Sequence, residues 1–595
     1  KVTFDRNNGT LQIEGPIRID QGGEITILAS AAEMDKDLRN GILNGARMVF
    51  QQQLQLASVQ MSRVNGRYTQ LYKTSATSCQ VCDDGSPPLW QIRAERVTHD
   101  QLERQLYFEN AQFRILDVPV FYFPGLRLPD PTLERASGFL VPSLRTTSTL
   151  GTGIKVPYFF TFGDSRDLTL SPYLSSKTRT LDARYRQAFK NGRIDLQGAV
   201  TRDDLQPGDT RGYLFADGGF NLRNDFKLEF DLKAASDDAY LADYGLPDLD
   251  RLRSRLTLTK VNRDSLFRAS AIYYKSLRDS DVSGEFPSAI GDIFYQRRYH
   301  PTQLGGEMQM TLLTHAHSRD SSEDTVGRDI ARMTFDANWQ REWRLQNGIV
   351  TQTQLGFSAD AFDIQDDSAY ASSASRLTPR GAITFRLPMT RITPNGDSEF
   401  LEPIVQLGWS DSSGDAVPND ESNFVEFDQG NLLELSRFPS IDAREDGLSF
   451  VYGTNWARYS TKGWQASAVV GQIFRSTADS SFTKSSGLGG TSSDILVAGQ
   501  LKLDDGLAIS TRGLLNGSLN FSKAEVRGDW FNQDAKVSGS YLWLGTDAEE
   551  GRPEETSEFW FDGSYKIHPN WSASANLRYD ISDSRASRAG IGFVY

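Results

Sequence analysis

Cysteine, histidine and long apolar runs are scarce in this 595-residue sequence, and basic residues are fewer than acidic ones. Its two cysteines exclude a disulfide-rich scaffold. No run approaches the ~18 consecutive apolar residues of a transmembrane helix, which excludes a helical membrane protein. The 64 Lys and Arg residues are outnumbered by 77 Asp and Glu, for a net charge of −13. This balance argues against a nucleic-acid partner, which a basic patch would have to bind.

What the chain does contain is a strand pattern that recurs along most of its length. Apolar and polar residues alternate at 226–232 (FKLEFDL) and again at 571–580 (WSASANLRYD). Alternation with period two is typical of a strand that has one apolar face. A soluble β-sandwich would alternate in the same way. Aromatic residues near the ends of many runs, and the lack of a convincing helical stretch, favour a large membrane β-barrel.

The number of strands follows from the length of the barrel-like region. With ~18 residues for each strand and its connection, the chain from Gly138 onward predicts about 24 to 26 antiparallel strands. Segments rich in Asp, Ser and Gly, such as 317–328 and 410–423, are expected to be exposed loops. We therefore expect residues 136–595 to form one very large transmembrane barrel.

The first 135 residues have a different pattern. Apolar residues sit in pairs between glycine-marked turns, and residues 5–11 match residues 37–43 as a weak repeat. Repeated short strands of this kind build a jelly roll or a stacked sheet. The chain starts inside such a unit without a visible signal peptide, so we expect a processed or trimmed form of a longer precursor. The sequence thus predicts an N-terminal all-β domain over residues 1–135.

The most specific motifs lie around the junction of these two regions. They are residues 90–100 (WQIRAERVTHD), 118–124 (VPVFYFP), 128–131 (LPDP), 137–142 (SGFLVP) and 167–172 (DLTLSP), followed by 236–244 (SDDAYLADY), 401–403 (LEP), 436–438 (SRF) and 442–446 (DARED). This ordered series resembles the LptD family of outer-membrane lipopolysaccharide (LPS) assembly proteins, whose N-terminal part is an OstA-type β-jelly roll. The resemblance spans nearly the whole chain.

The resemblance implies transport without catalysis. A member of this family receives LPS from a periplasmic LptA-like bridge protein and releases it into the outer leaflet, while an LptE-like lipoprotein plugs the barrel lumen. The resemblance also implies a location in the outer membrane of a Gram-negative bacterium, with the N-terminal domain in the periplasm. It implies no catalytic residue and no cofactor. It also implies an acyl-chain groove in the jelly roll, for which the candidates are Ile13, Ile17, Ile19, Ile25 and Ile27. The alternative for each isoleucine is a place in a packed core.

Three prolines stand 15 residues apart, at Pro142, Pro157 and Pro172, each within a stretch that otherwise predicts a strand. Proline donates no ladder hydrogen bond, so it weakens strand pairing. The resemblance makes Pro142 and Pro157 the prolines of a lateral gate between the first and last barrel strands. Alternatively, they mark strand beginnings near the periplasmic rim.

The remaining candidate sites are weaker. Cys79 and Cys82 form a Cys-x-x-Cys pair, which could be redox-active, half of a zinc site or a disulfide. In an oxidising periplasm a local disulfide is favoured, and no later cysteine exists for the long-range disulfides of the best-known LptD pattern. His315 and His317 would share one face of a strand, but a solvated loop is the favoured interpretation. We expect no metal site.

Three other protein classes are alternatives to this hypothesis. A TonB-dependent nutrient receptor also has an N-terminal domain before a giant barrel, and it is the main alternative. A BamA-type insertase would show helical periodicity in its N-terminal domains, which this sequence lacks. A plain porin would leave the first 135 residues without a role.

Overall fold

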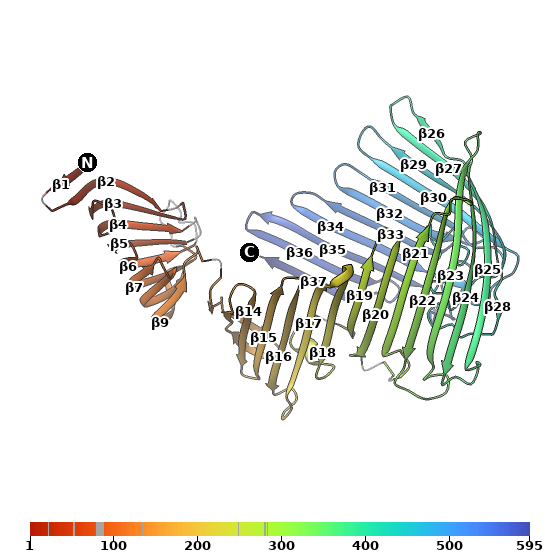
Figure 1. The fold of residues 1–595 in the computed structure, drawn as a ribbon, viewed down its shortest axis with the longest axis horizontal. Coiled ribbons are helices and arrows are strands. Elements are labelled where there is room, and N and C mark those ends of the chain that lie inside the picture. Colours follow the sequence, from red (N-terminus) through yellow and green to blue (C-terminus); the bar gives the residue numbers. More distant parts are fainter. Residues whose placement is uncertain are drawn as a thin grey trace. The chain divides into compact units, whose positions relative to one another are not determined.

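The computed structural model describes residues 1–594 except residues 7, 22, 51–53, 79–87, 134, 248, 279–280 and 283. Its strands form two antiparallel sheets, of nine and 28 strand pieces, in which the order follows the chain (Figure 1). By their contacts the residues fall into two compact units. One comprises Lys1–Phe220 and Phe230–Leu252, and the other Asn221–Glu229 and Arg253–Tyr595. No helix in the described residues is long and apolar enough to cross a membrane.

The first sheet is an uninterrupted meander. Its strands are β1 (Val2–Asp5), β2 (Thr10–Gln21), β3 (Ile25–Asp35), β4 (Gly41–Phe50), β5 (Leu54–Val64), β6 (Tyr68–Thr77), β7 (Trp90–Asp100), β8 (Gln105–Ile115) and β9 (Val118–Pro129). Alternate residues along β3 to β8 are buried, and they join one hydrophobic cluster. Because a single core takes side chains from β2 to β8, one face of this sheet encloses it.

The second sheet begins at Gly138. Its first strands are β10 (Gly138–Phe139), β11 (Ser143–Thr147), β12 (Gly151–Lys155), β13 (Tyr158–Thr161), β14 (Arg166–Ser175), β15 (Thr178–Phe189), β16 (Gly192–Asp203), β17 (Arg211–Asn221), β18 (Phe226–Ala235), β19 (Arg251–Val261), β20 (Ser265–Ser276), β21 (Ala289–Tyr299), β22 (Glu307–Ser318) and β23 (Asp329–Arg344). The later strands are β24 (Val350–Gln365), β25 (Ser373–Arg386), β26 (Met389–Ile392), β27 (Ser398–Ser410), β28 (Ser413–Gly414), β29 (Gly447–Tyr459), β30 (Gln465–Arg475), β31 (Ile495–Lys502), β32 (Leu507–Leu515), β33 (Phe521–Phe531), β34 (Ala535–Leu544), β35 (Thr556–His568), β36 (Trp571–Asp580) and β37 (Arg585–Val594). Its helices are short: η1 (Arg223–Asp225), α1 (Tyr240–Asp243) and η2 (Lys484–Ser486).

Some of these pieces are halves of one interrupted strand. β12 and β13 both pair with β14, while β11 pairs with β12 and β10 pairs with β13. In the same way, β25 and β26 both pair with β27, and β27 and β28 both pair with β25. Joining these four pairs of halves turns the 28 pieces into 24 strands in the described part of the chain. The predicted all-β class is confirmed, and 24 strands fall within the predicted range.

The two faces of the second sheet differ in the Arg253–Tyr595 unit. One face carries buried Val451, Ile473 and Leu496, which pack against Phe427 and Leu432 of a long loop, residues 415–446. We call this the loop-covered face. The opposite face presents exposed apolar side chains: Met333, Leu355, Leu377, Leu407 and Leu448. An exposed apolar face over many strands is typical of a sheet that lies in a bilayer.

The long loop corrects one sequence prediction. Residues 410–423 were expected to be an exposed loop, but the side chain of Ser422 is fully buried and Val417 packs against a cluster around Phe362. Composition indicates that a segment is polar, but it does not show that a later segment folds over it. Here Asp442 accepts a hydrogen bond from the Ser422 hydroxyl, at 2.6 Å.

Candidate functional site

The prolines predicted for the gate interrupt the first hairpin of the second sheet, which comprises β10 to β13. Pro142 directly precedes β11 and Pro157 directly precedes β13. The ladder continues past them, since the Leu140 amide donates to the Pro157 carbonyl (2.9 Å) and the Val156 amide to the Pro172 carbonyl (3.0 Å). Pro157 and Pro172 thus each accept a ladder hydrogen bond at adjoining levels of neighbouring strands, and Pro142 follows Leu140 by two residues on the next strand. We call these three prolines the proline row.

The proline row weakens pairing because none of its members can donate. Antiparallel partners ordinarily exchange two hydrogen bonds, yet Pro157 accepts from Leu140 and has no N–H to return. Pro172 differs from the other two prolines, because it lies inside β14 and is paired with Leu181 without a break. The lateral-gate role of Pro142 and Pro157 remains a prediction.

All five isoleucines predicted for an acyl-chain groove lie on the enclosed face of the first sheet. Ile17, Ile25 and Ile27 belong to the buried cluster, with Ile27 fully buried. Ile13 and Ile19, on β2, are only partly buried and pack against the same cluster. The structure thus brings the five side chains to one apolar interior, and their contact with acyl chains remains a proposal.

The same interior contains a buried polar pair. His99 Nε2 lies 2.7 Å from Asp130 Oδ2, and both side chains are almost fully buried. The Thr132 hydroxyl and amide donate to the other carboxylate oxygen. Burial raises the pKa of Asp130, but the hydrogen bonds from His99 and Thr132 outweigh it and lower that pKa below its usual value. The pair ties β7 to the segment that follows β9.

A second charged pair closes the turn between β7 and β8. Arg67 Nη2 donates to Asp100 Oδ2 at 2.7 Å, and the Leu102 and Glu103 amides donate to the other oxygen. The hydrogen bond from Arg67, with these amides, lowers the pKa of Asp100 to about 2. The carboxylate therefore holds this turn in its ionised form.

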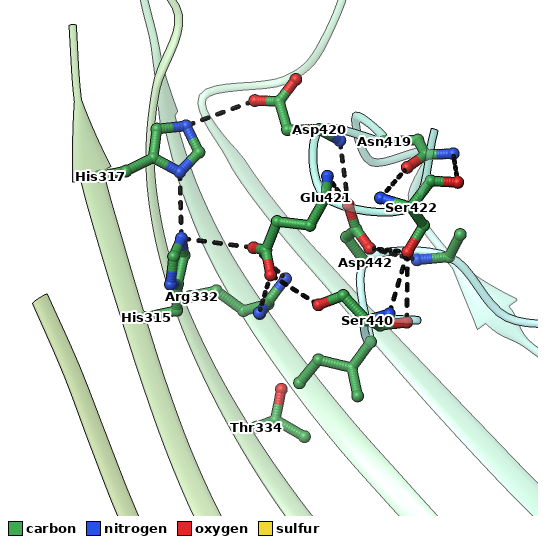
Figure 2. A network of polar contacts seen from close by, with 12 residues as sticks. His315, His317, Arg332, Thr334, Asn419, Asp420, Glu421, Ser422, Ser440 and Asp442 are labelled. Atoms are coloured by element: carbon green, nitrogen blue, oxygen red, sulfur yellow. Dashed lines mark hydrogen bonds and ion pairs between the residues drawn. The ribbon is translucent and has the colours of Figure 1, made fainter. Parts of the chain in front are cut away.

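A polar network of the second unit joins the long loop to β22 and β23 (Figure 2). His315 and His317 lie on one face of β22, as their spacing predicts, with His315 Nε2 3.0 Å from His317 Nδ1. The favoured interpretation of a solvated loop is wrong, since both residues belong to a strand and His317 is buried. Each histidine faces a carboxylate of the long loop: His315 faces Glu421 and His317 faces Asp420, both at 3.3 Å.

Arginines complete this network. Asp420 forms ion pairs with Arg319 and Arg328, and Glu421 pairs with Arg332 at 3.1 Å. Burial raises the pKa of Asp420, but the hydrogen bonds from His317 and Arg328 hold it well below its usual value. The loop is consequently fixed to the wall of the sheet through ionised carboxylates.

The far end of the long loop is fixed in a similar way. Arg444 donates to Asp360 of β24 at 3.1 Å, and Arg437 pairs with Glu445, which also faces Arg475 of β30. Residues 436–438 and 442–446 belong to the motifs that carry the family resemblance, but the sequence predicts no role for them. Their partners on the strands, Asp360 and Arg475, could not be recognised from the sequence, because charged residues are common in an alternating strand.

The other predicted sites add little. Cys79 and Cys82 lie outside the described residues, so the disulfide stays a prediction. Within the described residues, no group of three or more His, Cys, Asp or Glu side chains is arranged to hold a metal ion. In the predicted loop 317–328, Asp324 is exposed, and its carboxylate accepts hydrogen bonds from Ser368.

These features define a class: a β-sheet protein with a small N-terminal sheet around an apolar core and a 24-strand antiparallel sheet in the described residues, whose later part has one exposed apolar face and one face covered by a long, ion-paired loop. The family model LptD, described as LPS transport system D, matches residues 209–595, well over half of the chain. The chain belongs to the LptD family, which confirms the resemblance found in the sequence.

Curated relatives extend the match to the N-terminal region. The LPS-assembly protein LptD of Nitrosococcus oceani is 29% identical over 98% of this chain and 79% of its own length. That of Idiomarina loihiensis is 22% identical over 80% of this chain and 62% of its own length. Among solved structures, the alcaligin outer-membrane receptor FauA from Bordetella pertussis covers 97% of this chain and 87% of its own, at 9% identity and a TM-score of 0.26. A similarity that low carries no argument about fold or function.

Proposed function

We propose that this chain transports LPS and inserts it into the outer leaflet of the outer membrane of a Gram-negative bacterium. The observation that carries the proposal is membership of the LptD family, together with relatives named as LPS-assembly proteins. In this proposal no bond of the lipid is broken. The chain serves as a route for LPS.

Two kinds of surface support such a route. The acyl chains of LPS need an apolar path, and the enclosed face of the first sheet supplies one, with Ile13 and Ile19 only partly buried. The sugars need a wet path, and the loop-covered face of the second sheet is lined with paired charges such as Arg332 with Glu421. We propose that the acyl chains follow the first of these surfaces and the sugars the second.

The proposal includes a lateral gate and two protein partners. Release would occur at the first hairpin, where Pro142 and Pro157 reduce strand pairing. An LptA-like bridge would deliver LPS to the N-terminal domain, here taken as residues 1–135 in the periplasm. An LptE-like lipoprotein would plug the lumen of a barrel formed by residues 136–595. These details rest on the family resemblance.

The test is site-specific photo-crosslinking in cells. A photoreactive residue replaces Ile19 in the apolar interior or Leu140 beside the proline row. Matched controls carry it at Asp20, the neighbour on the opposite face of β2, and at the exposed Thr146 of β11. We expect LPS adducts at Ile19 and Leu140, and few at either control. Folded protein that gives no adduct at either test site would contradict the route and favour the nutrient-receptor alternative.

A further inference from the structure

The first hairpin is held to its neighbours by short ladders. β11 and β12 share five residue pairs, from Ser143 with Lys155 to Thr147 with Gly151. β12 contacts β14 through only three, those of Gly153 to Lys155. At its base the hairpin meets the proline row, where the strands are interrupted and a donor is missing. Backbone pairing alone therefore leaves the segment from Ser143 to Lys155 weakly attached.

A loop between β18 and β19 supplies a rigid support nearby. We call residues 236–246 the clasp loop; they include α1 and the family motif at 236–244. Arg211 of β17 has a side chain only 1% exposed, and it pairs with Asp203 at 3.1 Å, Asp237 at 2.7 Å and Asp243 at 2.8 Å. Two of these three carboxylates belong to the clasp loop. An arginine that is buried among three carboxylates fixes them strongly, since breaking such a group would leave unpaired buried charge.

Two tyrosines fix the clasp loop to the sheet as well. Tyr240 is 1% exposed, and its hydroxyl lies 2.8 Å from that of Thr201. The Tyr244 hydroxyl donates to Asp203 at 2.7 Å, and its ring stacks on Tyr240 with centroids 4.6 Å apart. The clasp loop is therefore a fixed part of the β15–β17 wall.

One side chain connects this fixed loop to the hairpin. Arg145, in the middle of β11, donates from Nη1 to the carbonyl oxygen of Tyr244 at 2.5 Å. Gly245 lies beside it with a φ of +58°, a conformation that residues with a side chain rarely adopt, and a Cβ there would meet the Arg145 guanidinium. Within the described residues Arg145 forms no ion pair, so its charged donor is met by a neutral carbonyl. A hydrogen bond from a charged donor is strong enough to hold a strand. Because its acceptor is a neutral carbonyl, it can break without leaving an unpaired buried carboxylate.

Further contacts hold the base and the tip of the hairpin. At its base, Lys155 Nζ of β12 pairs with Asp182 of β15 at 2.9 Å. At its tip, the Ser175 hydroxyl donates to the Leu150 carbonyl at 2.6 Å, and Lys177 Nζ donates to the Thr149 carbonyl at 3.2 Å. The Leu150 side chain is fully buried. The hairpin thus has a hinge at its base, a seat for its tip, and one side-chain connection midway.

We propose that the β11–β12 hairpin is a flap that turns about the proline row, and that Arg145 is the positioning residue that latches it to the clasp loop. This inference rests on the proposed function, in which the first hairpin forms one side of the lateral exit. The clasp loop then sets the resting position of that side, and the family motif at 236–244 has a role as the fixed point of the latch.

The test compares backbone hydrogen exchange of residues 143–155 in the full-length protein in lipid nanodiscs. In Arg145→Ala we expect exchange in this segment to become about tenfold faster, because a charged hydrogen bond that limits local opening is lost. Arg145→Lys should recover part of the protection, because an ammonium group can still donate to the Tyr244 carbonyl. The matched control is Arg202→Ala, an exposed arginine of β16 outside the latch.

Two results would overturn the latch. One is an unchanged exchange rate at 143–155 in Arg145→Ala. The other is faster exchange across the whole sheet, including β29 to β32, which would indicate a general folding defect. Cell-surface LPS, measured in the same variants, tests the proposed function separately. A faster-exchanging flap with unchanged LPS display would leave the latch standing and would contradict lateral release at this hairpin.

Discussion

At the scale of single residues, several buried arginines are met by carboxylates from distant segments. Arg211 lies among three aspartates, and Arg437 and Arg475 share Glu445. Such groups are costly to bury and more costly to leave incomplete. They tie together segments that are distant in the chain, so the effect of changing one depends on what its partner loses.

His99 provides a direct test of this cost. Replacing it by leucine keeps the apolar contact with Phe50 but leaves the Asp130 carboxylate without its buried partner. We expect His99→Leu to destabilise the first sheet by about 3–5 kcal/mol. Denaturant unfolding, followed by hydrogen exchange in β7 and β8, measures this loss. His568→Leu, at an exposed histidine, is the matched control, and equal stability of the two variants would contradict the prediction.

Asp100 predicts how the first sheet responds to acid. Its pKa falls from 3.8 to about 2 in the folded chain, so its ionised form binds Arg67 more tightly than an unfolded chain would allow. The stabilisation is fully present above pH 3.8 and is lost as the pH falls through about 2. We expect the Leu102 and Glu103 amides to lose exchange protection over that interval, after correction for intrinsic rates.

The variant Asp100→Asn separates this effect from general acid unfolding. It should show low protection of the same two amides already at pH 5, and little further pH dependence between 3.8 and 2. Asp37→Asn, at an exposed carboxylate of another turn, should behave as the unchanged chain does. A wild-type turn that stays equally protected at pH 2 and pH 5 would show that Asp100 does not hold it.

At the scale of elements, the role of the proline row can be tested by substitution. Changing Pro142 and Pro157 together to alanine adds two N–H donors to the first hairpin, each worth about 1 kcal/mol if it finds an acceptor. We expect the gate strands to pair more firmly and LPS export to slow. Export is measured as newly made LPS that reaches the cell surface. Pro119→Ala together with Pro124→Ala in β9 is a control for proline loss elsewhere, and unchanged export in the gate variant would rule the gate role out.

Sequence periodicity could predict the elements well but not the contacts between loops and strands. Alternation of side chains fixes which residues share a face, which is why the isoleucines of the first sheet and His315 with His317 were correctly placed together. The fold of the long loop could not be predicted, because Asp420 meets arginines about 90 to 100 positions earlier in the chain. Local composition has no information on such distant partners.

At the scale of the whole molecule, family membership and strand number could be predicted from the sequence, and the role of each motif could not. The motif at 236–244 carried the resemblance, but its meaning depends on Arg211 and Arg145, which lie outside it. The motifs at 436–438 and 442–446 likewise depend on Asp360 and Arg475. A motif of this kind supplies only one side of each interaction, and the partner residues are known only from the folded structure.

Both sheets keep strict chain order, and this has a consequence for how the molecule is made. Each strand finds its partner one connection away, so the chain closes only a short loop for each new pair, and the entropic cost of each step is small. Growth can proceed hairpin by hairpin from any completed pair, and an early error of register would pass to every later strand. In a chain of this length, the correct register of the first paired strands therefore matters more than fast pairing of the last ones.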